Sequence, residues 1–433
     1  TLTMTSGTGS TIAVAGNIGG GSGLAGLTIT QSNGTTFSGN VNVNDVNGGG
    51  GTITITDTEN GADITFAGSV VAQTLDLAQQ GYDLIFNGGA TFANAVTFDN
   101  TGTLNLGNAS DDAFTFNGGL TETTTGTVTL AGSIDSSNDV ISFGAITLAA
   151  ATTLDTNATN TTGDITIGAV TGANNNLTLD TTTSTGSASH TFTGDINLGS
   201  GALGVIGDVV LGANVSVTAT GGIVFNDAID ADNASSNDRT LTLNAGTGSG
   251  ITVVGGIGGS QALAGLTVSQ SNAATFLGAV DVSDSASGTI TLTDTTDSRN
   301  IGFNGNVTAD TFTTAAQGYN LILNGDTTIA NAVTFQNTGT LTLGNTAADT
   351  LTFNGGVTES TSGTVTIVGA IVSSDDTISF GAISLGEDLS VTSAGGAISI
   401  GAITSSAARD VTITSSGGSA NTVTLSTLSG GNM

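Results

Sequence analysis

The residues of this chain that could do chemistry are few, and almost all of them are carboxylates. The chain holds 34 Asp and Glu, one histidine, three Lys and Arg together and no cysteine. A Cys–His or Ser–His–Asp site, a zinc or haem site, and a lysine-containing phosphate loop all need residues that are missing or present once. His190 lies in an alternating stretch, and we expect it to be a strand residue facing solvent. The inventory predicts that the chain is not an enzyme and carries no catalytic or cofactor-binding residues.

The densest acidic patch lies near residue 230 and contains Asp227, Asp230, Asp232 and Asp238. Clustered carboxylate oxygens are the ligands that Ca²⁺ prefers. Asp230, Asp232 and Asp238 are therefore the candidate metal ligands, and Ca²⁺ is the candidate cofactor. The same carboxylates would be the acids of a polysaccharide-active enzyme, but such a site also needs cationic partners, which are scarce here.

A second acidic segment, residues 57–63, places oxygen ligands around a glycine in the manner of a calcium loop. Its counterpart at residues 294–299 loses the glycine and gains Arg299, which a cation site should not accept. Paired acids such as Asp111–Asp112 and Asp375–Asp376 lie in expected turns, where Asp bonds its own backbone. These segments predict local structure, together with diffuse cation binding.

The formal net charge of −31 argues against binding nucleic acid or an anionic membrane through basic patches. It also keeps neighbouring molecules apart in solution. The absence of cysteine fits an extracellular bacterial chain that does not depend on disulfides. No apolar run of eighteen residues exists, so we expect no membrane span.

The chain repeats itself over a long period. Residues 1–10 return as residues 240–249, and Ile141 to Ile146 return as Ile378 to Ile383. We therefore divide the chain into a first super-repeat, 1–239, and a second, incomplete copy, 240–433. The sequence starts at a repeat boundary and stops within a copy. We expect a segment of a longer chain, with an end-to-end polymer of subunits as the alternative.

Within each copy, short strands alternate with glycine-rich turns. Residues 52–56 read Thr-Ile-Thr-Ile-Thr, and similar stretches recur throughout, which is typical of β-strands. Many strands end in Asn-Gly, where positive φ is tolerated and a corner forms without strain. The phenylalanines Phe66, Phe98, Phe143 and Phe380 are expected in the core, and Tyr82 and Tyr319 at corners.

Two folds use short strands of this kind: a row of β-sandwiches and a β-solenoid. Sandwich domains favour longer strands, a Trp-like anchor and Pro-containing linkers, whereas this chain has neither Trp nor Pro. Phe66, Phe86 and Leu106 are spaced twenty residues apart. The fold class we predict is therefore all-β: a parallel β-helix, or β-solenoid, with roughly twenty residues per coil and a single elongated rod about 100 Å long.

This pattern resembles the β-solenoid shafts of filamentous haemagglutinin-like passengers and autotransporter-type giant β-strand-repeat surface proteins. The resemblance covers the whole chain and rests on its composition and rhythm. It implies an exported protein that acts as a stalk, an adhesin or a biofilm fibre.

The function we expect is structural: a segment of an extracellular fibre or cell-surface stalk. Its partner would be the chain itself, in a continuous chain or in end-to-end or lateral fibres. The alternative is an adhesin segment that binds glycans or cell surfaces, and the less favoured reading is a polysaccharide-active β-helix enzyme.

Overall fold

A computed structural model gives the structure of the chain. It describes residues 1–45, 50–156, 162–181, 188–232, 239–284, 287–360, 363–417 and 421–430, with the exception of the Asp57 side chain. The described residues form two compact units, Thr1–Val209 and Val210–Met433.

The first unit contains the following strands: β1 (Leu2–Gly7), β2 (Ile12–Val14), β3 (Gly26–Ser32), β4 (Thr35–Phe37), β5 (Val41–Val43), β6 (Thr52–Thr58), β7 (Asp63–Phe66), β8 (Val70–Ala72), β9 (Thr74–Leu77), β10 (Asp83–Phe86), β11 (Ala90–Phe92), β12 (Val96–Phe98), β13 (Leu104–Leu106), β14 (Ala113–Phe116), β15 (Leu120–Glu122), β16 (Val128–Asp135), β17 (Ile141–Phe143), β18 (Ile146–Asp155), β19 (Ile165–Ile167), β20 (Val170–Thr171), β21 (Leu177–Asp180), β22 (Ser189–Phe192), β23 (Ile196–Gly199) and β24 (Leu203–Ile206). Strand β25 (Asp208–Leu211) includes the residues on both sides of the division.

The second unit contains these strands: β26 (Val215–Ala219), β27 (Ile223–Phe225), β28 (Ile229–Ala231), β29 (Thr240–Asn244), β30 (Gly250–Val253), β31 (Gly265–Gln270), β32 (Ala273–Phe276), β33 (Val280–Val282), β34 (Thr289–Leu292), β35 (Asn300–Phe303), β36 (Val307–Ala309), β37 (Thr311–Thr314), β38 (Asn320–Leu323), β39 (Thr327–Ile329), β40 (Val333–Phe335), β41 (Leu341–Leu343), β42 (Thr350–Phe353), β43 (Val357–Glu359), β44 (Val365–Ser373), β45 (Ile378–Phe380), β46 (Ile383–Ser393), β47 (Ile398–Ser405), β48 (Val411–Ser415) and β49 (Val423–Gly430).

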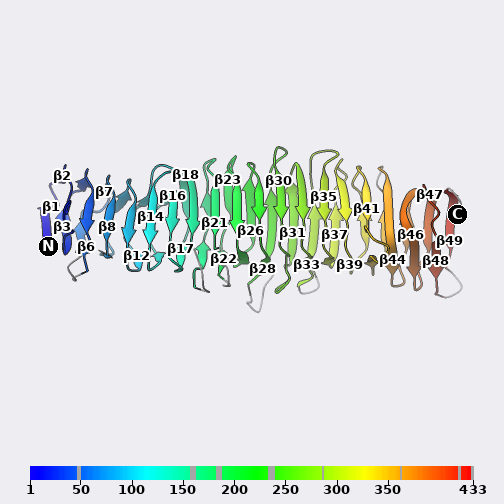
Figure 1. Cartoon of the computed structure of the whole chain (residues 1–433). Helices are drawn as coiled ribbons and strands as arrows, with labels where there is room; N and C mark the ends of the chain where they lie inside the picture. Colours follow the sequence, from blue (N-terminus) through cyan, green and yellow to red (C-terminus); the bar gives the residue numbers. More distant parts are fainter. Residues whose placement is uncertain are drawn as a thin grey trace. The chain divides into compact units, whose positions relative to one another are not determined.

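The strands of each unit wind into a parallel β-solenoid, as the alternating pattern predicts. The chain makes about 17 turns of about 23 residues and contains no helix in its described part. Figure 1 shows successive coils of each unit lying side by side in sequence order. Strands β7, β10 and β13 stack in register at the expected spacing of twenty residues, since Phe66 pairs with Phe86 and Phe86 with Leu106. Coils with longer corners raise the average above twenty: Phe37 pairs with Phe66, 29 residues on.

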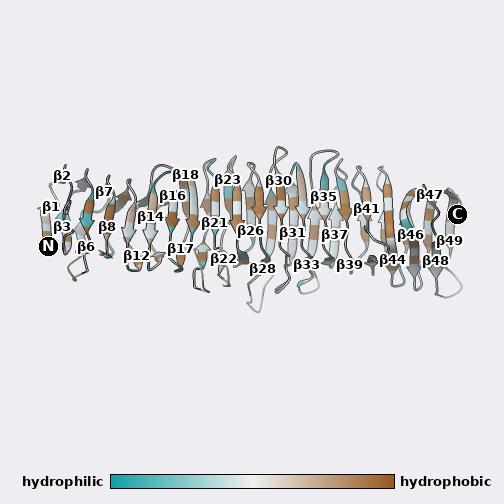
Figure 2. Cartoon of the chain, in the orientation of Figure 1, coloured by the Kyte–Doolittle hydropathy of each residue, from teal (hydrophilic) through white to brown (hydrophobic). Residues whose placement is uncertain are grey.

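Alternation within each strand separates a dry interior from a polar exterior. In β10, Leu84 and Phe86 are buried, while Asp83 and Ile85 are half-buried. Figure 2 shows apolar and polar residues alternating along many strands. Successive side chains of a strand point to opposite faces, so each coil adds one inward layer of aliphatic or aromatic residues. This accumulated burial is the main favourable term that holds the coils together.

Phenylalanines form stacks inside the coils. The rings of Phe37, Phe66 and Phe86 lie parallel, with 4.9 Å between the centroids of successive rings. The second unit repeats the arrangement with Phe276 and Phe303 at 4.8 Å. Because parallel in-register strands lie about 4.8 Å apart, like residues in one ladder meet at stacking distance. Expected core residues are confirmed as buried: Phe66, Phe98, Phe143 and Phe380.

The Asn-Gly corners form for a reason that the sequence pattern did not predict. Neither residue of Asn87–Gly88 or Asn117–Gly118 has a positive φ; the left-handed residue is the following glycine, Gly89 or Gly119. A Cβ at Gly88 would lie 2.7 Å from the backbone carbon of Gly68 in the preceding coil. The first glycine is therefore required by close backbone approach between coils, and the second by backbone conformation.

The sequence repeat and the two compact units are different properties of the chain. The copies 1–239 and 240–433 are defined by residue identity, whereas the units are defined by contacts and divide at Val209. Residues at the same position of the two copies are called counterparts below. In the described part of the chain, no helix has the length and apolar character needed to cross a bilayer.

Candidate functional site

The candidate calcium ligands lie on and just after β28. Asp230 and Asp232 flank the buried Ala231, so both carboxylates leave the same outer face of the strand. Asp232 accepts two hydrogen bonds from Arg239, from Nε at 3.0 Å and from NH2 at 2.8 Å. This bond raises the pKa of the Arg239 guanidinium. Asp238 lies outside the described residues.

Asp230 has a different role in the loop that follows Ile257. Its Oδ1 accepts the backbone N–H groups of Ser260 at 2.8 Å and Gln261 at 3.2 Å. Both candidate carboxylates are thus engaged as acceptors, one by a guanidinium and one by the backbone. Among the described residues, no group of three or more His, Asp or Glu side chains is placed to hold a metal ion.

His190 is a core residue, and the expectation that it faces solvent was wrong. Its side chain on β22 has no exposed surface, and it pairs across the ladder with Ile165. Nε2 lies 3.0 Å from the carbonyl oxygen of Ile206 and 3.2 Å from the hydroxyl of Thr181. A carbonyl can only accept, so Nε2 carries the proton of a neutral imidazole. The sequence contained a feature that predicts this burial. Phe192 lies two residues further along the same strand and faces inward, and residues two apart in a strand lie on the same face.

Burial lowers the pKa of His190, and this effect outweighs the bond to Ile206 and the charges of Asp180, Asp164 and Asp208, which raise it. Nδ1 has no hydrogen-bond partner among the described residues. A second proton there would be a buried, unsatisfied charge. His190 is therefore held neutral and is suited to packing.

Two carboxylates that sequence reasoning missed lie near Tyr82. Burial raises the pKa of Asp99, and so does the charge of Asp76; both carboxylates raise the pKa of Tyr82, which burial raises most. A carboxyl group with a raised pKa, such as that of Asp99 beside a buried tyrosine, is a general sign of a functional site. The counterparts of Asp76 and Asp99 are Thr313 and Gln336, so the second copy lacks the group.

Other acidic side chains close corners, as was expected for Asp in turns. Oδ2 of Asp112 accepts the N–H groups of Asn108 at 2.8 Å and Ala109 at 3.0 Å. Its counterpart Asp349 does the same with Asn345 and Thr346. At Asp349 burial raises the pKa, but these donors and the Thr346 hydroxyl lower it more, and the net shift is downward.

A matched pair of glutamates bonds the neighbouring coil. Glu122 accepts the N–H of Gly144 at 3.0 Å, and its counterpart Glu359 accepts that of Gly381 at 2.9 Å. Burial raises the pKa of Glu122 despite this bond. Repetition of the contact at the same position in both copies indicates a structural role.

A buried asparagine lies beneath each tyrosine. Nδ2 of Asn337 donates to the carbonyl oxygens of Tyr319 at 3.3 Å and Thr340 at 3.0 Å. Its counterpart Asn100 bonds Tyr82 and Thr103 in the same way. Tyr82 and Tyr319 are fully buried, so they belong to the core beside these corners.

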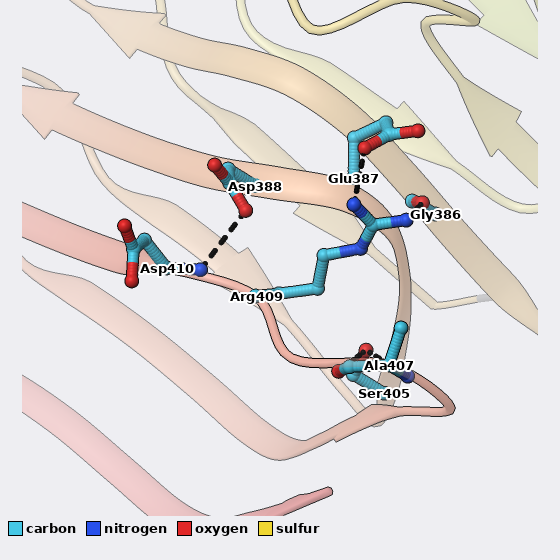
Figure 3. A network of polar contacts seen from close by, with 7 residues as sticks. All are labelled: Gly386, Glu387, Asp388, Ser405, Ala407, Arg409 and Asp410. Carbon is cyan, nitrogen blue, oxygen red and sulfur yellow. Dashed lines mark hydrogen bonds and ion pairs between the residues drawn. The ribbon is translucent and has the colours of Figure 1, made fainter. Parts of the chain in front are cut away.

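A further polar group surrounds Arg409 near the end of the second unit (Figure 3). The guanidinium forms an ion pair with Glu387 and donates to the carbonyl oxygen of Gly386 at 2.7 Å. The backbone N–H of Asp410, which directly precedes β48, donates to Oδ1 of Asp388 on β46 at 3.0 Å. Each contact joins one coil to the next and so stabilises the stack.

Two surface hollows, one in each unit, are lined by polar and aliphatic residues. One of about 230 Å³ in the first unit is lined by Asn17, Asn40, Asn42 and Ser69, with backbone from Gly19. Oδ1 of Asn17 accepts the N–H of Asn40, and Oδ1 of Asn40 that of Ser69. A second hollow of about 370 Å³, near Thr364 and Thr404, is also lined by hydroxyl and aliphatic groups. Neither contains a carboxylate.

Comparison with known proteins adds no relative. No family model matches the chain, and neither the curated proteins nor the solved structures give a match.

Proposed function

We propose that the chain is a structural segment of an extracellular bacterial fibre or cell-surface stalk and that it performs no catalysis. The observation that carries this proposal is the composition of the core. In each unit, the stacked parallel strands bury aliphatic and phenylalanine side chains between the coils. Continuous parallel ladders give a stiff, extended scaffold with a dry core. The buried side chains of Asn100 and Asn337 each donate a hydrogen bond to a tyrosine carbonyl oxygen of the neighbouring coil.

The pattern shared with filamentous haemagglutinin-like and autotransporter-type shafts supports the same proposal. Solenoid architecture is common to this chain and those shafts, and a net charge of −31 without cysteine suits a protein outside the cell. Membership of that family, export and a place in a biofilm are parts of the proposal.

The location is tested on intact cells that produce the protein. Antibodies raised against the purified chain, applied with gold labels before permeabilisation, should decorate filaments outside the cell. Labelling that appears only after the cells are opened would contradict an extracellular role.

The absence of catalysis is tested on a panel of acidic and neutral polysaccharides. We expect no new reducing or unsaturated ends after prolonged incubation with the purified chain. Turnover that disappears in an Asp230→Asn or Asp232→Asn variant would instead establish the enzyme alternative.

An adhesin segment is the second candidate, and the asparagine-lined hollow favours it. Amide and backbone groups around Asn17 and Asn40 could bond sugar hydroxyls. No aromatic side chain lines that hollow, so it lacks a stacking platform. A glycan array probed with the labelled chain should remain blank if the role is structural; binding that is lost in Asn40→Ala would favour the adhesin.

A further inference from the structure

An asparagine followed by a glycine is a chemically reactive pair as well as a corner. Asparagine is a thermolabile residue type, and a following glycine has no Cβ to hinder attack of its nitrogen on the asparagine side chain. The described part of the chain contains seven such pairs, which begin at Asn33, Asn60, Asn87, Asn117, Asn304, Asn324 and Asn354. An eighth pair, Asn47–Gly48, lies outside the described residues. The structure separates the seven by how freely the peptide group between the two residues can turn.

In five of these corners the glycine lies tightly against the preceding coil. A Cβ at the glycine would lie 2.3–2.8 Å from a backbone atom of that coil at Gly88, Gly118, Gly305, Gly325 and Gly355. Some of the asparagine side chains are also bonded: Oδ1 of Asn117 accepts the Ser137 hydroxyl at 2.8 Å. A peptide group packed in this way cannot rotate without moving the coil beside it.

The corner at Asn60–Gly61 has room, but hydrogen bonds hold it. A Cβ at Gly61 would meet no atom within 4 Å. The N–H of Gly61 donates to the carbonyl oxygen of Gly81 at 2.8 Å, and Oδ1 of Asn60 accepts the N–H of Gly81 at 3.0 Å. The nitrogen that would attack and the side chain that it would attack are therefore both engaged.

Asn33–Gly34 has neither constraint, although coils lie on both sides of it. The N–H of Asn33 donates to Ser10 of the preceding coil at 2.8 Å. A Cβ at Gly34 would lie 3.4 Å from the carbonyl oxygen of Asp63 in the following coil, which is an ordinary contact. Asn33 is exposed, and within the described residues neither its side-chain amide nor the Gly34 N–H has a hydrogen-bond partner.

The surrounding structure fixes the ends of this corner and leaves its central peptide group free to turn. The corner joins β3 to β4, and the flanking Ser32 and Thr35 are buried, with their hydroxyl oxygens 2.9 Å apart. The carbonyl oxygen of Gly34 accepts the N–H of Ile12 at 2.9 Å. Gly34 has a φ of +119°, which glycine adopts without strain. The Gly34 nitrogen can therefore turn towards the Asn33 side chain while the strands stay in place.

The second copy contains the same corner without the glycine. Asn272 and Ala273 are the counterparts of this pair, and the N–H of Asn272 donates to Ser249 at 2.7 Å, as in the first copy. Ala273 begins β32, pairs with Gly250 and has no positive φ. Its Cβ and its place in the ladder both hinder ring closure. Asn272–Ala273 is therefore an internal control for the reactive pair.

We propose that Asn33 is a site of spontaneous deamidation in the folded chain. The nitrogen of Gly34 attacks Cγ of Asn33 and forms a bond to it. The Cγ–Nδ2 bond breaks, and the amide nitrogen leaves as ammonia with the proton of the Gly34 N–H. Water then opens the succinimide ring at either carbonyl, which gives aspartate or isoaspartate and adds one carboxylate to the corner. Water is the only co-reactant, and the inference is independent of the structural role proposed above.

Water enriched in heavy oxygen detects the reaction, because ring opening takes one oxygen atom from water. The purified full chain is incubated in this water, digested in ordinary water and mapped by tandem mass spectrometry. We expect label at Asn33 to accumulate at least about tenfold faster than at Asn272 or at the other six described pairs, a difference of about 1.4 kcal/mol in activation free energy.

The chain unfolded in urea sets the length of the incubation, since all seven pairs should react at similar rates once the fold no longer constrains them. Equal labelling of Asn33 and Asn272 in the folded chain would overturn the inference. Faster labelling of another described pair would do the same, and so would an Asn33 without label after an incubation that converts the unfolded chain.

Two exchanges between the copies test the role of the glycine. Gly34→Ala should lower the rate at Asn33 towards that of Asn272, and Ala273→Gly should raise the rate at Asn272. Gly248→Ala is the matched control, since a Cβ there meets no atom within 4 Å, and it should leave both rates unchanged. Far-UV circular dichroism identifies any variant that fails to fold. An unchanged rate at Asn33 in folded Gly34→Ala, or at Asn272 in folded Ala273→Gly, would overturn the inference.

Discussion

At the scale of single residues, the buried polar side chains carry the most specific interactions of this protein. His190 and Asn337 have no exposed surface, and each donates to main-chain carbonyl groups. The net contribution of one hydrogen bond to the free energy of unfolding is about 1 kcal/mol. A buried polar group that loses its partner lowers the free energy of unfolding by more than this. Their effects on stability should therefore exceed those of the exposed polar residues around them.

His190 should make stability depend on pH. Its folded pKa is below its ordinary value of 6.5, so below that pH the unfolded chain binds a proton that the folded chain excludes. Stability is then complete above pH 6.5 and falls as the pH drops, by about 1.4 kcal/mol per pH unit until the folded pKa is reached. Urea unfolding of the parent and of His190→Val between about pH 7.5 and 5 measures the difference. A constant difference across this range would contradict the prediction.

Asn337→Ala should lower the free energy of unfolding by about 1–3 kcal/mol, because it leaves the carbonyl oxygens of Tyr319 and Thr340 without their donor. Asn324→Ala is the matched control. Asn324 also donates a side-chain hydrogen bond, to Asn304 at 2.8 Å, but in an exposed position. Its replacement should cost less than about 0.5 kcal/mol. Equal losses in the two variants, measured by chemical denaturation, would argue against the role assigned to burial.

At the scale of the strand and its corner, the close approach of two backbone segments limits which residue type can occupy some corner positions. Gly51 and its counterpart Gly288 directly precede β6 and β34. A Cβ at either position would lie 1.5 Å from a carbonyl oxygen, that of Val43 or Val282. These corners tolerate only glycine, even though neither residue has a positive φ.

Gly288→Ala should therefore destabilise the second unit by about 1–3 kcal/mol or more, because the backbone must move to relieve the overlap. Gly248→Ala is the control, since a Cβ there meets no atom within 4 Å. That variant should match the parent in thermal unfolding. A Gly288→Ala chain as stable as the control would show that the corner relaxes freely.

At the scale of the whole molecule, charge is the property that solution conditions can change most. A net charge of −31 implies self-repulsion, which salt screens with a Debye length of about 8 Å at physiological ionic strength. Asp230 and Asp232 accept hydrogen bonds in the structure, and we expect cation binding to be diffuse.

The melting temperature should therefore rise with ionic strength, and NaCl and CaCl₂ should act alike once ionic strength is matched, apart from the closer accumulation of a divalent ion. Asp232→Asn tests the remaining possibility. A calcium-specific stabilisation that this variant abolishes would establish a calcium site at β28. If Asp232→Asn keeps the same increase in melting temperature with CaCl₂, the result agrees with the diffuse cation binding expected here.

The sequence by itself determined the class of fold and the composition of the core. Alternating strands of Val, Ile, Leu, Phe and Thr, glycine corners, a twenty-residue spacing and the lack of Trp and Pro together favoured short stacked coils over a row of β-sandwiches. The four phenylalanines expected in the core are buried. These features are local, because a strand's period and a turn's chemistry are set by neighbouring residues.

Only the tertiary structure decided which groups meet across coils. The pairing of Asp232 with Arg239, the neutral environment of His190 and the approach of Gly88 to Gly68 depend on register between segments about seven to thirty residues apart. Register follows from the lengths of the corners, which vary from coil to coil, and not from the pattern within a strand.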